Sequence, residues 1–381
     1  KMKVVTAIDS FKGSMTSMEA GFAAAEGIHR VDADAEVQVR PLADGGEGTV
    51  EALVAGMNGK TEHVSVTGPL GNTVEASYGI IAETKTAIIE MAAAAGITLL
   101  AEKDRNPLYT TTYGVGELIR DAIKKGCRNF IVGIGGSATN DGGVGMLQAL
   151  GCHFYKKDGI EIGFGATELK DLETIDMEAL DKRLKECTFE IACDVTNPLC
   201  GTTGASAVFA PQKGADETMV VKLDAALAHF ADVTEKALGV DNRNMPGAGA
   251  AGGLGFAFAS YLGGDLRPGV EIVLDAVLSE KELSEADIVV TGEGRFDGQT
   301  AMGKAPVGVA SLAKKYCIPV IAFAGGVTRD AVACNEKGID AFFPVVRGVS
   351  TLEEAMKPET AKVNVTDTVE QVFRLIYNCR R

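Results

Sequence analysis

The chain has 381 residues, of which 46% are hydrophobic and 23% charged, and its formal net charge is -15. This length suggests about two domains, each large enough to bury its own core. The negative charge and the lack of a Lys/Arg-rich block argue against nucleic acid and anionic membranes as partners. No apolar run approaches the roughly 20 residues needed to span a bilayer. We therefore expect a soluble protein that binds anions only by local means, such as helix N-termini, a few basic side chains or a bridging cation.

The eight cysteines include no C-x-x-C pair, and no histidine lies at zinc-finger spacing. In a chain with a full-sized core, reduced structural thiols are the expected outcome. The apolar run after Met2 is short and is interrupted by Asp9 and Lys12, which is unlike a secretory signal. We therefore expect a cytoplasmic protein.

Two strand-loop-helix units open the chain. Residues 3–9 form a β-branched run, and Thr16 with Glu19 makes a capping box, which predicts that a helix starts near the following serine. A second strand is expected over residues 36–43, followed by a glycine-rich loop and a helix from about Glu47.

Three more units stand near the other end. We expect a strand from Asp287 with a helix over 306–316, further strands over 318–324 and 340–346, and a last amphipathic helix over 367–378. Five strands alternating with helices indicate a parallel sheet with helices on both faces.

The intervening segment has a different pattern. Residues 61–92 are alternating runs joined by turn residues, which favours antiparallel strands. A helix over 111–125, a strand over 129–133, a buried strand ending at Asp194 and a glycine-rich amphipathic helix over 248–263 follow.

The predicted fold is therefore α/β with two domains. Residues 1–61 and 266–381 form a discontinuous domain with a five-stranded parallel sheet. Residues 62–265 form a second, mixed α/β domain inserted between strands 2 and 3.

Charged and glycine-rich loops follow three of the five strands. Ligands of open α/β sheets bind beyond the carboxyl ends of the strands. Turn chemistry and N-capping could explain each loop alone. Three such loops at one edge favour a bound cation or anionic ligand. The candidate residues are Asp9, Ser10, Lys12, Asp44, Gly45, Gly46, Glu47, Glu293 and Arg295.

Residues 298–305, GQTAMGKA, are similar to the nucleotide-binding P-loop, but Ala305 replaces the hydroxyl residue that would ligate magnesium. Lys304 at the expected helix start is a candidate phosphate ligand. A solvated lysine at a helix end is the alternative.

Residues 133–143, GIGGSATNDGG, formally match the dinucleotide fingerprint G-x-G-x-x-G/A. The last four of these residues would break the helix that the fingerprint requires, so we expect a helix only from around Val144. We favour a loop that presents N–H groups and polar side chains to phosphate or substrate oxygens. Its candidate residues are Gly135, Gly136, Ser137, Asn140 and Asp141.

Asp194 ends an apolar strand just before the turn at Asn197. It could ligate magnesium or act as a general base, and an Asx-turn is the structural alternative. The four histidines lie outside every candidate loop, which argues against a Ser/His/Asp triad and a His-ligated metal.

Six motifs together resemble the bacterial glycerate kinase family of the type that is not built on a P-loop. They are DSFKGS (9–14), PLADGGEGT (41–49), GIGGSATNDGG (133–143), CDVTNPLCG (193–201), GAGAAGGLG (247–255) and TGEGRFDGQTAMGKAPVGVA (291–310). The resemblance implies a flavodoxin-like domain carrying an inserted α/β domain. It also implies ATP- and Mg²⁺-dependent phosphorylation of D-glycerate, commonly to 2-phosphoglycerate.

The resemblance also suggests roles for the candidate residues. Asp44, Glu47 and Asp194 would be magnesium ligands or bases, with Asp194 the preferred base. Lys12 and Arg295, with Arg267 as an additional candidate, would hold the glycerate carboxylate or the transferred phosphoryl group. Phosphates would contact Gly135, Gly136, Ser137 and Lys304. The other substrate- or phosphate-binding candidates are Asp9, Ser10, Gly45, Gly46, Asn140, Asp141, Asn197 and Glu293.

Other functions stay open at this point. A kinase for a related small hydroxy acid would use the same scaffold, and a non-catalytic protein could bind a small anion between two domains. Carboxylates beside glycines favour the enzyme, since an anion sensor gains nothing from them without a metal. The oligomeric state is also open, with a homodimer as one alternative.

Overall fold

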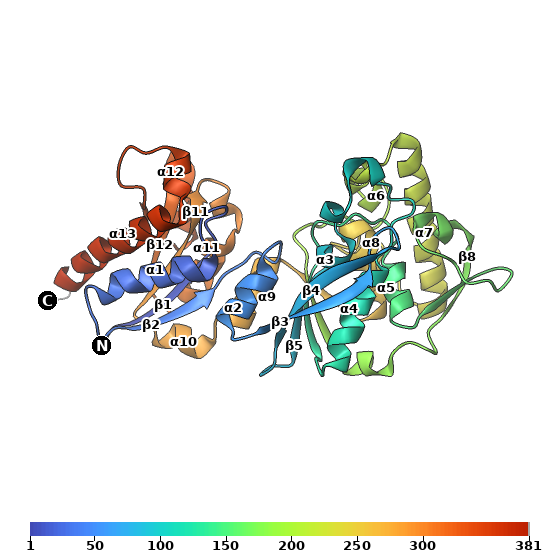
Figure 1. Cartoon of the computed structure of the whole chain (residues 1–381), viewed down its shortest axis with the longest axis horizontal. Coiled ribbons are helices and arrows are strands. Elements are labelled where there is room, and N and C mark those ends of the chain that lie inside the picture. The colour runs from blue at the N-terminus through green and yellow to red at the C-terminus, as the bar shows by residue number, and fades with distance from the viewer. Residues whose placement is uncertain (380–381) are drawn as a thin grey trace. The chain divides into compact units, whose positions relative to one another are not determined.

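The structure is a computed structural model that describes residues 1–379 (Figure 1). Its contacts divide the chain into two compact units. Unit 1 comprises Lys1–Asp44, Glu51–Asn58 and the chain from Val270 onward. Unit 2 comprises Gly45–Val50 and Gly59–Gly269.

Unit 1 contains a five-stranded sheet in the order β13-β12-β11-β1-β2, and all its pairings are parallel. This confirms the prediction of a parallel sheet. The strands are β1 (Lys3–Ile8), β2 (Glu36–Pro41), β11 (Ile288–Phe296), β12 (Val320–Val327) and β13 (Ala341–Pro344). Its helices are α1 (Ser17–His29), most of α2 (Thr49–Gly56) and α9 (Gly269–Val277), α10 (Glu280–Glu285), α11 (Ala305–Lys314), α12 (Leu352–Met356) and α13 (Pro358–Cys379).

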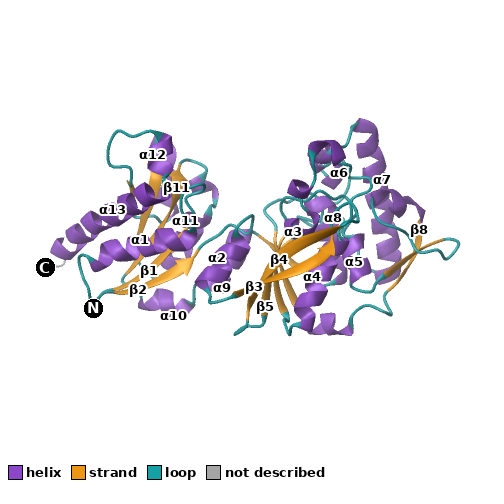
Figure 2. Ribbon diagram, in the orientation of Figure 1, coloured by secondary structure: helices purple, strands orange, loops and turns teal. Residues whose placement is uncertain are grey.

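Helices α1 and α13 lie side by side on this sheet (Figure 2). The predicted capping box at Thr16 is present, and α1 starts at Ser17. Both helices share one core with Val4 and Ile8 of β1. Helices α10 and α11 also contact β1 but contribute nothing to that core, so they lie on the other face of the sheet.

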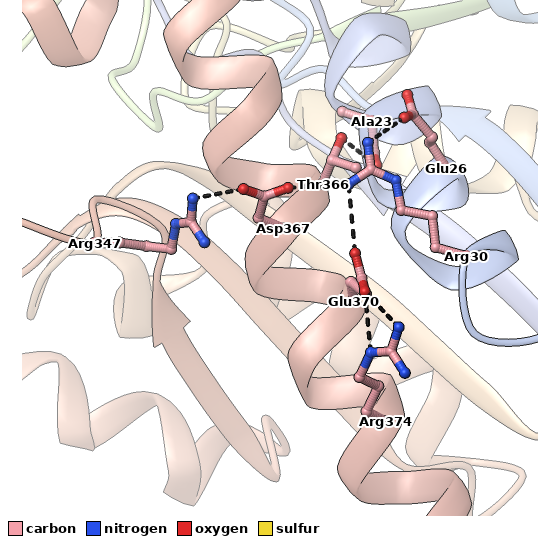
Figure 3. A network of polar contacts seen from close by, with 8 residues as sticks. All are labelled: Ala23, Glu26, Arg30, Arg347, Thr366, Asp367, Glu370 and Arg374. Atoms are coloured by element: carbon pink, nitrogen blue, oxygen red, sulfur yellow. Dashed lines mark hydrogen bonds and ion pairs between the residues drawn. The ribbon is translucent and has the colours of Figure 1, made fainter.

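Charged contacts tie α13 to α1 and to the segment after β13 (Figure 3). Arg30 at the end of α1 donates to Asp367 at 3.0 Å and to Glu370 at 3.4 Å, both on α13. Arg347 donates to Asp367 at 2.5 Å. Partly exposed ion pairs typically contribute about 0–1 kcal/mol each, so we attribute most of the stability of this contact to the apolar core.

Unit 2 contains a six-stranded sheet in the order β10-β9-β6-β5-β4-β3 and a separate two-stranded sheet, β7-β8. The strands are β3 (Lys60–Thr67), β4 (Thr73–Ile81), β5 (Thr86–Glu90), β6 (Asn129–Gly133), β7 (His153–Lys156), β8 (Leu172–Asp176), β9 (Thr188–Ala192) and β10 (Asp265–Arg267). The pairing of β3, β4 and β5 is antiparallel, as predicted for residues 61–92, and the remaining pairs of the large sheet are parallel.

The helices of unit 2 are α3 (Ala92–Ala95), α4 (Tyr113–Lys124), α5 (Val144–Ala149), α6 (Ala205–Phe209), α7 (Glu217–Leu238) and α8 (Ala250–Tyr261). The prediction of one continuous helix over 248–263 is wrong at its start, because φ is positive at Ala251, Gly252 and Gly253. A Cβ on Gly252 would lie 2.0 Å from the carbonyl oxygen of Thr139, so the backbone approaches closely there and regular helix begins only afterwards.

All eight cysteines are free. Among residues 1–379, no helix combines the length and the apolar character that crossing a membrane requires.

Candidate active site

The carboxyl ends of β1 and β11 meet in unit 1 at the point where the strand order reverses. From β1 the chain continues through α1 to β2 on one side, and β11 continues to β12 on the other. Ligands of open parallel sheets bind at such a switch point. The N–H of Asp9 donates to the carbonyl of Gly292 at 2.9 Å, and a Cβ on Gly294 would lie 3.4 Å from the Cα of Phe11. The fold therefore brings the predicted loops after β1 and β11 together.

Charged side chains gather at this edge. Lys12 Nζ lies 3.8 Å from an oxygen of Asp44, which follows β2. Lys304 Nζ, at the start of α11, lies 3.7 Å from an oxygen of Glu293. Asp9 accepts a hydrogen bond from the N–H of Ser10 at 2.7 Å. We call these residues the switch-point group: Asp9, Ser10, Lys12, Asp44, Glu293 and Lys304.

Burial raises the pKa of Asp9 to about 6. The Ser10 N–H opposes this increase, whereas repulsion from Asp44 and Glu293 adds to it. A carboxyl group that titrates near neutrality beside two other carboxylates can exchange a proton or share a cation with them.

Glu293 is 9% exposed and accepts a hydrogen bond from Thr300 Oγ1 at 2.6 Å. Burial raises the pKa of Glu293, although the Thr300 hydroxyl and Lys304 lower it. Arg295 extends into solvent, with its side chain 71% exposed and Nε 3.6 Å from Asp297. The sequence analysis missed Thr300, because a hydroxyl inside a turn carries no signal of its partner.

In unit 2, β6 leads into the glycine-rich segment, and α5 starts at Val144, as predicted. Gly135 and Gly136 form the exposed part of this segment, whereas Ser137 is 7% exposed. Asn140 and Asp141 are 0% and 1% exposed. Only Gly135 and Gly136 of residues 133–143 are therefore exposed, and the rest of the segment is packed into unit 2.

Asp141 is surrounded by hydrogen-bond donors. It accepts bonds from Thr112 N and Oγ1, both at 2.9 Å, from Gly143 N at 3.1 Å and from Gly145 N at 3.2 Å. Burial nevertheless raises the pKa of Asp141. Asn140 Nδ2 donates to Ser206 Oγ at 3.0 Å. In this conformation both side chains support the loop from inside.

Glu90 is the last residue of β5, and Asp194 lies two residues beyond the end of β9. Asp194 is exposed and accepts a hydrogen bond from Gly269 N at 3.0 Å. Glu90 accepts one from Val50 N at 3.0 Å. Burial raises the pKa of Glu90, and the exposed Glu47 adds to this by repulsion. Sequence reasoning missed Glu90, although an acid that ends the apolar run TAIIE is the same signal that identified Asp194.

Gly45 lies where only glycine fits. A Cβ there would come within 2.6 Å of Gly269 Cα and 2.8 Å of Ala192 Cβ, and φ is +87°. Gly46 O accepts hydrogen bonds from the N–H and hydroxyl of Thr49 at 3.2 and 2.7 Å. Both glycines shape the turn into α2.

Two further candidates are engaged within unit 2. Arg267 contacts Glu190 at 2.5 Å and Asp265 at 3.2 Å. Asn197 Nδ2 donates to the carbonyl of Thr203 at 2.9 Å.

The candidates thus divide between the two units. Unit 1 holds the switch-point group and Arg295. Unit 2 holds Gly45, Gly46, Glu47, Gly135, Gly136, Ser137, Asn140, Asp141, Asp194, Asn197 and Arg267. Within residues 1–379, no three or more His, Cys, Asp or Glu side chains are arranged as a preformed metal site.

A parallel α/β sheet with carboxylates and lysines at its switch point, in a chain with an exposed glycine turn, is typical of enzymes that handle small anionic substrates. Comparison with known proteins narrows this class. A model of the glycerate kinase family matches residues 4–377. The Escherichia coli K12 glycerate 2-kinase is 51% identical over 356 residues, which is 93% of each chain. The Bacillus subtilis 168 glycerate kinase is also 51% identical over 93% of each chain.

A solved structure agrees with these relatives. The crystal structure of a glycerate kinase 2 candidate from Salmonella typhimurium LT2 has a TM-score of 0.91 and 47% identity, and the match covers 100% of this chain and 99% of that one. This chain belongs to the glycerate kinase family, which confirms the resemblance seen in the sequence.

Proposed function

We propose that the chain phosphorylates D-glycerate with ATP and Mg²⁺, and that the product is 2-phosphoglycerate. Family membership over nearly the whole chain supports glycerate as the substrate, and a relative named glycerate 2-kinase supports the product. The observation from the structure that best supports a kinase is the switch-point group, where two lysines lie within 4 Å of carboxylates.

The proposal includes the fold assignment. The order β2-β1-β11-β12-β13 corresponds to the flavodoxin-like order 2-1-3-4-5. We assign unit 1 to this domain and unit 2 to the inserted one; residues 45–50, 59–61 and 266–269, which the sequence analysis gave to the first domain, lie in unit 2.

Phosphoryl transfer depends mainly on positioning and charge neutralisation. We assign Lys12, Lys304 and Arg295 to anionic oxygens of the substrates, because these cations lie at or beside the ligand-binding edge of the sheet. The N–H groups of Gly135 and Gly136 are assigned to phosphate oxygens.

The carboxylates of unit 1 fit a magnesium ion, which prefers oxygen ligands and keeps several waters. Burial is the main reason why the pKa of Asp9 is raised, and repulsion from Asp44 and Glu293 adds to it; a bound dication would relieve that repulsion. When bound, Mg²⁺ neutralises phosphate charge. Asp44 is the first choice of ligand in unit 1, and Glu47 and Asp194 stay predicted ligands in unit 2.

The proposed base is Asp194, which would take the proton from the attacking hydroxyl. Its bond from Gly269 N orients the carboxylate, which is exposed beyond the end of β9. Asp9 is the second candidate, because a carboxyl group with a pKa of about 6 can accept a proton at neutral pH.

ADP release coupled to NADH oxidation tests the proposal. We expect release that needs both D-glycerate and Mg²⁺, and ³¹P NMR of the product should show phosphate on the 2-hydroxyl. Faster release with another hydroxy acid would favour the related kinase, and ADP release that ignored glycerate would reject the proposal. Retention of the chain on immobilised glycerate without turnover would favour an anion-binding protein.

We further propose a cytoplasmic enzyme whose partners are small molecules. The net charge of -15 supports this, since nucleic acid and anionic lipid would be repelled. Light scattering after gel filtration would decide between a monomer and a homodimer.

A further inference from the structure

Lys213 is a buried lysine that none of the proposed roles uses. It ends the short 3₁₀ helix η5 (Pro211–Lys213) in unit 2 and is 2% exposed. Its Nζ donates a hydrogen bond to the carbonyl oxygen of Thr139 at 2.6 Å. Lysine is almost never fully buried without a dedicated partner, so this contact needs an explanation.

The position is unfavourable for an ammonium group. Burial lowers the pKa of Lys213 to about 7, and the negative charge of Asp141 acts in the opposite direction. Asp141 is part of the same loop and is itself buried. Buried charges of opposite sign rarely gain stability over apolar side chains of similar size. A requirement for one defined loop conformation explains their presence better than stability does.

The hydrogen bond from Lys213 is one of three that hold carbonyl groups of residues 136–139 from inside unit 2. The three donors come from separate parts of the chain. The bonds are Ile97 N to Gly136 O at 2.8 Å, Thr110 Oγ1 to Ala138 O at 2.9 Å and Lys213 Nζ to Thr139 O at 2.6 Å.

The kink at the start of α8 holds the same part of the loop. A Cβ on Gly252 would lie 2.0 Å from the Thr139 carbonyl oxygen, and Gly142 N donates to Gly252 O at 2.9 Å. The Thr139 carbonyl therefore contacts both the kink and the ammonium group. Gly136, three residues earlier, is exposed and has a φ of +72°.

We infer that Lys213 is a positioning residue, whose ammonium group holds the Thr139 carbonyl and thereby sets the conformation in which Gly135, Gly136 and Ser137 meet substrate oxygens. The inference rests on the proposed function, because it requires that this loop binds ATP or glycerate. Lys213 itself touches neither substrate, since its side chain lies under the loop.

The first test is steady-state kinetics of Lys213→Met, which keeps the apolar stem and removes the ammonium group. A hydrogen bond to a charged group is worth about 1.5–3 kcal/mol, so KM for the substrate that the loop binds should rise about tenfold or more. The KM for the other substrate should change less than threefold. Unchanged KM values for both substrates would overturn the inference.

Leu223→Ala is the matched control. Leu223 is 1% exposed and packs with Ala166 and Ala210, next to η5. Its truncation destabilises the same region without removing a donor to Thr139. We expect a lower melting temperature with both KM values within twofold of wild type. An equal rise in KM for the two variants would mean that Lys213 acts only through stability.

A second measurement does not depend on catalysis. Amide hydrogen exchange, followed by mass spectrometry, should be about tenfold faster for peptides covering 133–143 in Lys213→Met and unchanged there in Leu223→Ala. Equal exchange in wild type and Lys213→Met would overturn the inference. Faster exchange with unchanged KM values would also overturn it, because binding would then not require the loop conformation.

If Lys213→Met does not fold, the double variant Lys213→Met/Asp141→Asn replaces it, with Asp141→Asn as its reference. Removing both charges avoids leaving one buried and unpaired. The two proposals can fail separately. Wild-type protein that releases no ADP with glycerate would reject the proposed function, and hydrogen exchange would still decide whether Lys213 holds the loop.

Discussion

Replacing Asp9 with asparagine should stabilise the folded protein at alkaline pH and reduce its activity. The folded pKa of Asp9 is about 6, against an ordinary value of 3.8. Because the folded value is the higher one, the stability that comes from protonating Asp9 is complete below pH 3.8 and is lost as the pH rises through 6. Asparagine keeps an oxygen for the Ser10 N–H and carries no charge to repel Asp44 and Glu293.

The magnitude follows from the two pKa values. They differ by about 2, and each pH unit corresponds to 1.36 kcal/mol, so the ionised carboxylate destabilises the fold by about 3 kcal/mol at pH 8. At pH 4.5 most folded molecules carry a protonated Asp9, and the same linkage relation gives a destabilisation of only about 1 kcal/mol. The gain in free energy of unfolding of Asp9→Asn over wild type should therefore be about 2 kcal/mol smaller at pH 4.5 than at pH 8.

Urea unfolding at pH 8 and pH 4.5, followed by circular dichroism, measures this difference. Asp34→Asn is the control, because Asp34 is exposed in the same unit and its substitution should have the same small effect at both pH values. In the activity assay Asp9→Asn should lower kcat/KM, since Asp9 stands at the proposed ligand edge. A free-energy difference between Asp9→Asn and wild type that is equal at both pH values would refute the argument from burial and repulsion.

Three other results are expected. Asp194→Asn should reduce turnover by roughly 10²–10⁴-fold. The amide oxygen can still accept the hydrogen bond from Gly269 N–H, so the melting temperature should stay within a few degrees of wild type. Near-normal turnover would exclude Asp194 as the base. Gly27→Ala should destabilise unit 1 by about 1–3 kcal/mol, because the added Cβ would lie 2.4 Å from the Thr366 carbonyl oxygen. Urea unfolding measures this change, and an unchanged unfolding midpoint would contradict the contact. EDTA should abolish glycerate-dependent ADP release, and excess Mg²⁺ should restore it. The far-ultraviolet circular dichroism spectrum should stay unchanged throughout. Full activity in EDTA would exclude a magnesium requirement.

Local signals in the sequence predict much of the fold. The capping box at Thr16 identifies the start of α1, and alternation over residues 61–92 identifies three antiparallel strands. The small sheet β7-β8 was missed, because its two strands are 15 residues apart along the chain and no hairpin turn joins them. The kink in α8 was missed for a different reason, since it depends on the approach of Gly252 to Thr139.

The candidate site is predictable where it follows from topology. Asp9 and Glu293 were identified because parallel strands place their carboxyl ends at one edge, and in unit 1 that edge gathers them. Thr300 and Lys213 were missed because their importance depends on partners that are distant in sequence or hidden inside a turn, whereas Glu90 was missed although it ends an apolar run as Asp194 does. A lone lysine in a PQKG turn has no local feature that predicts its burial.

Asp9 and Asp141 both lie in candidate loops, and together they show that the sequence alone does not reveal the role of such an aspartate. Asp9 accepts a bond from its neighbour Ser10 and lies among other charged side chains. Asp141 accepts four bonds, two from Thr112 in front of α4 and two from N–H groups at the start of α5. A carboxylate with four donors cannot bind a cation or take a substrate proton without losing some of them. We therefore assign Asp141 a structural role in its loop and Asp9 a chemical role at the sheet edge. This distinction depends on hydrogen-bond donors that only the folded structure brings to each aspartate.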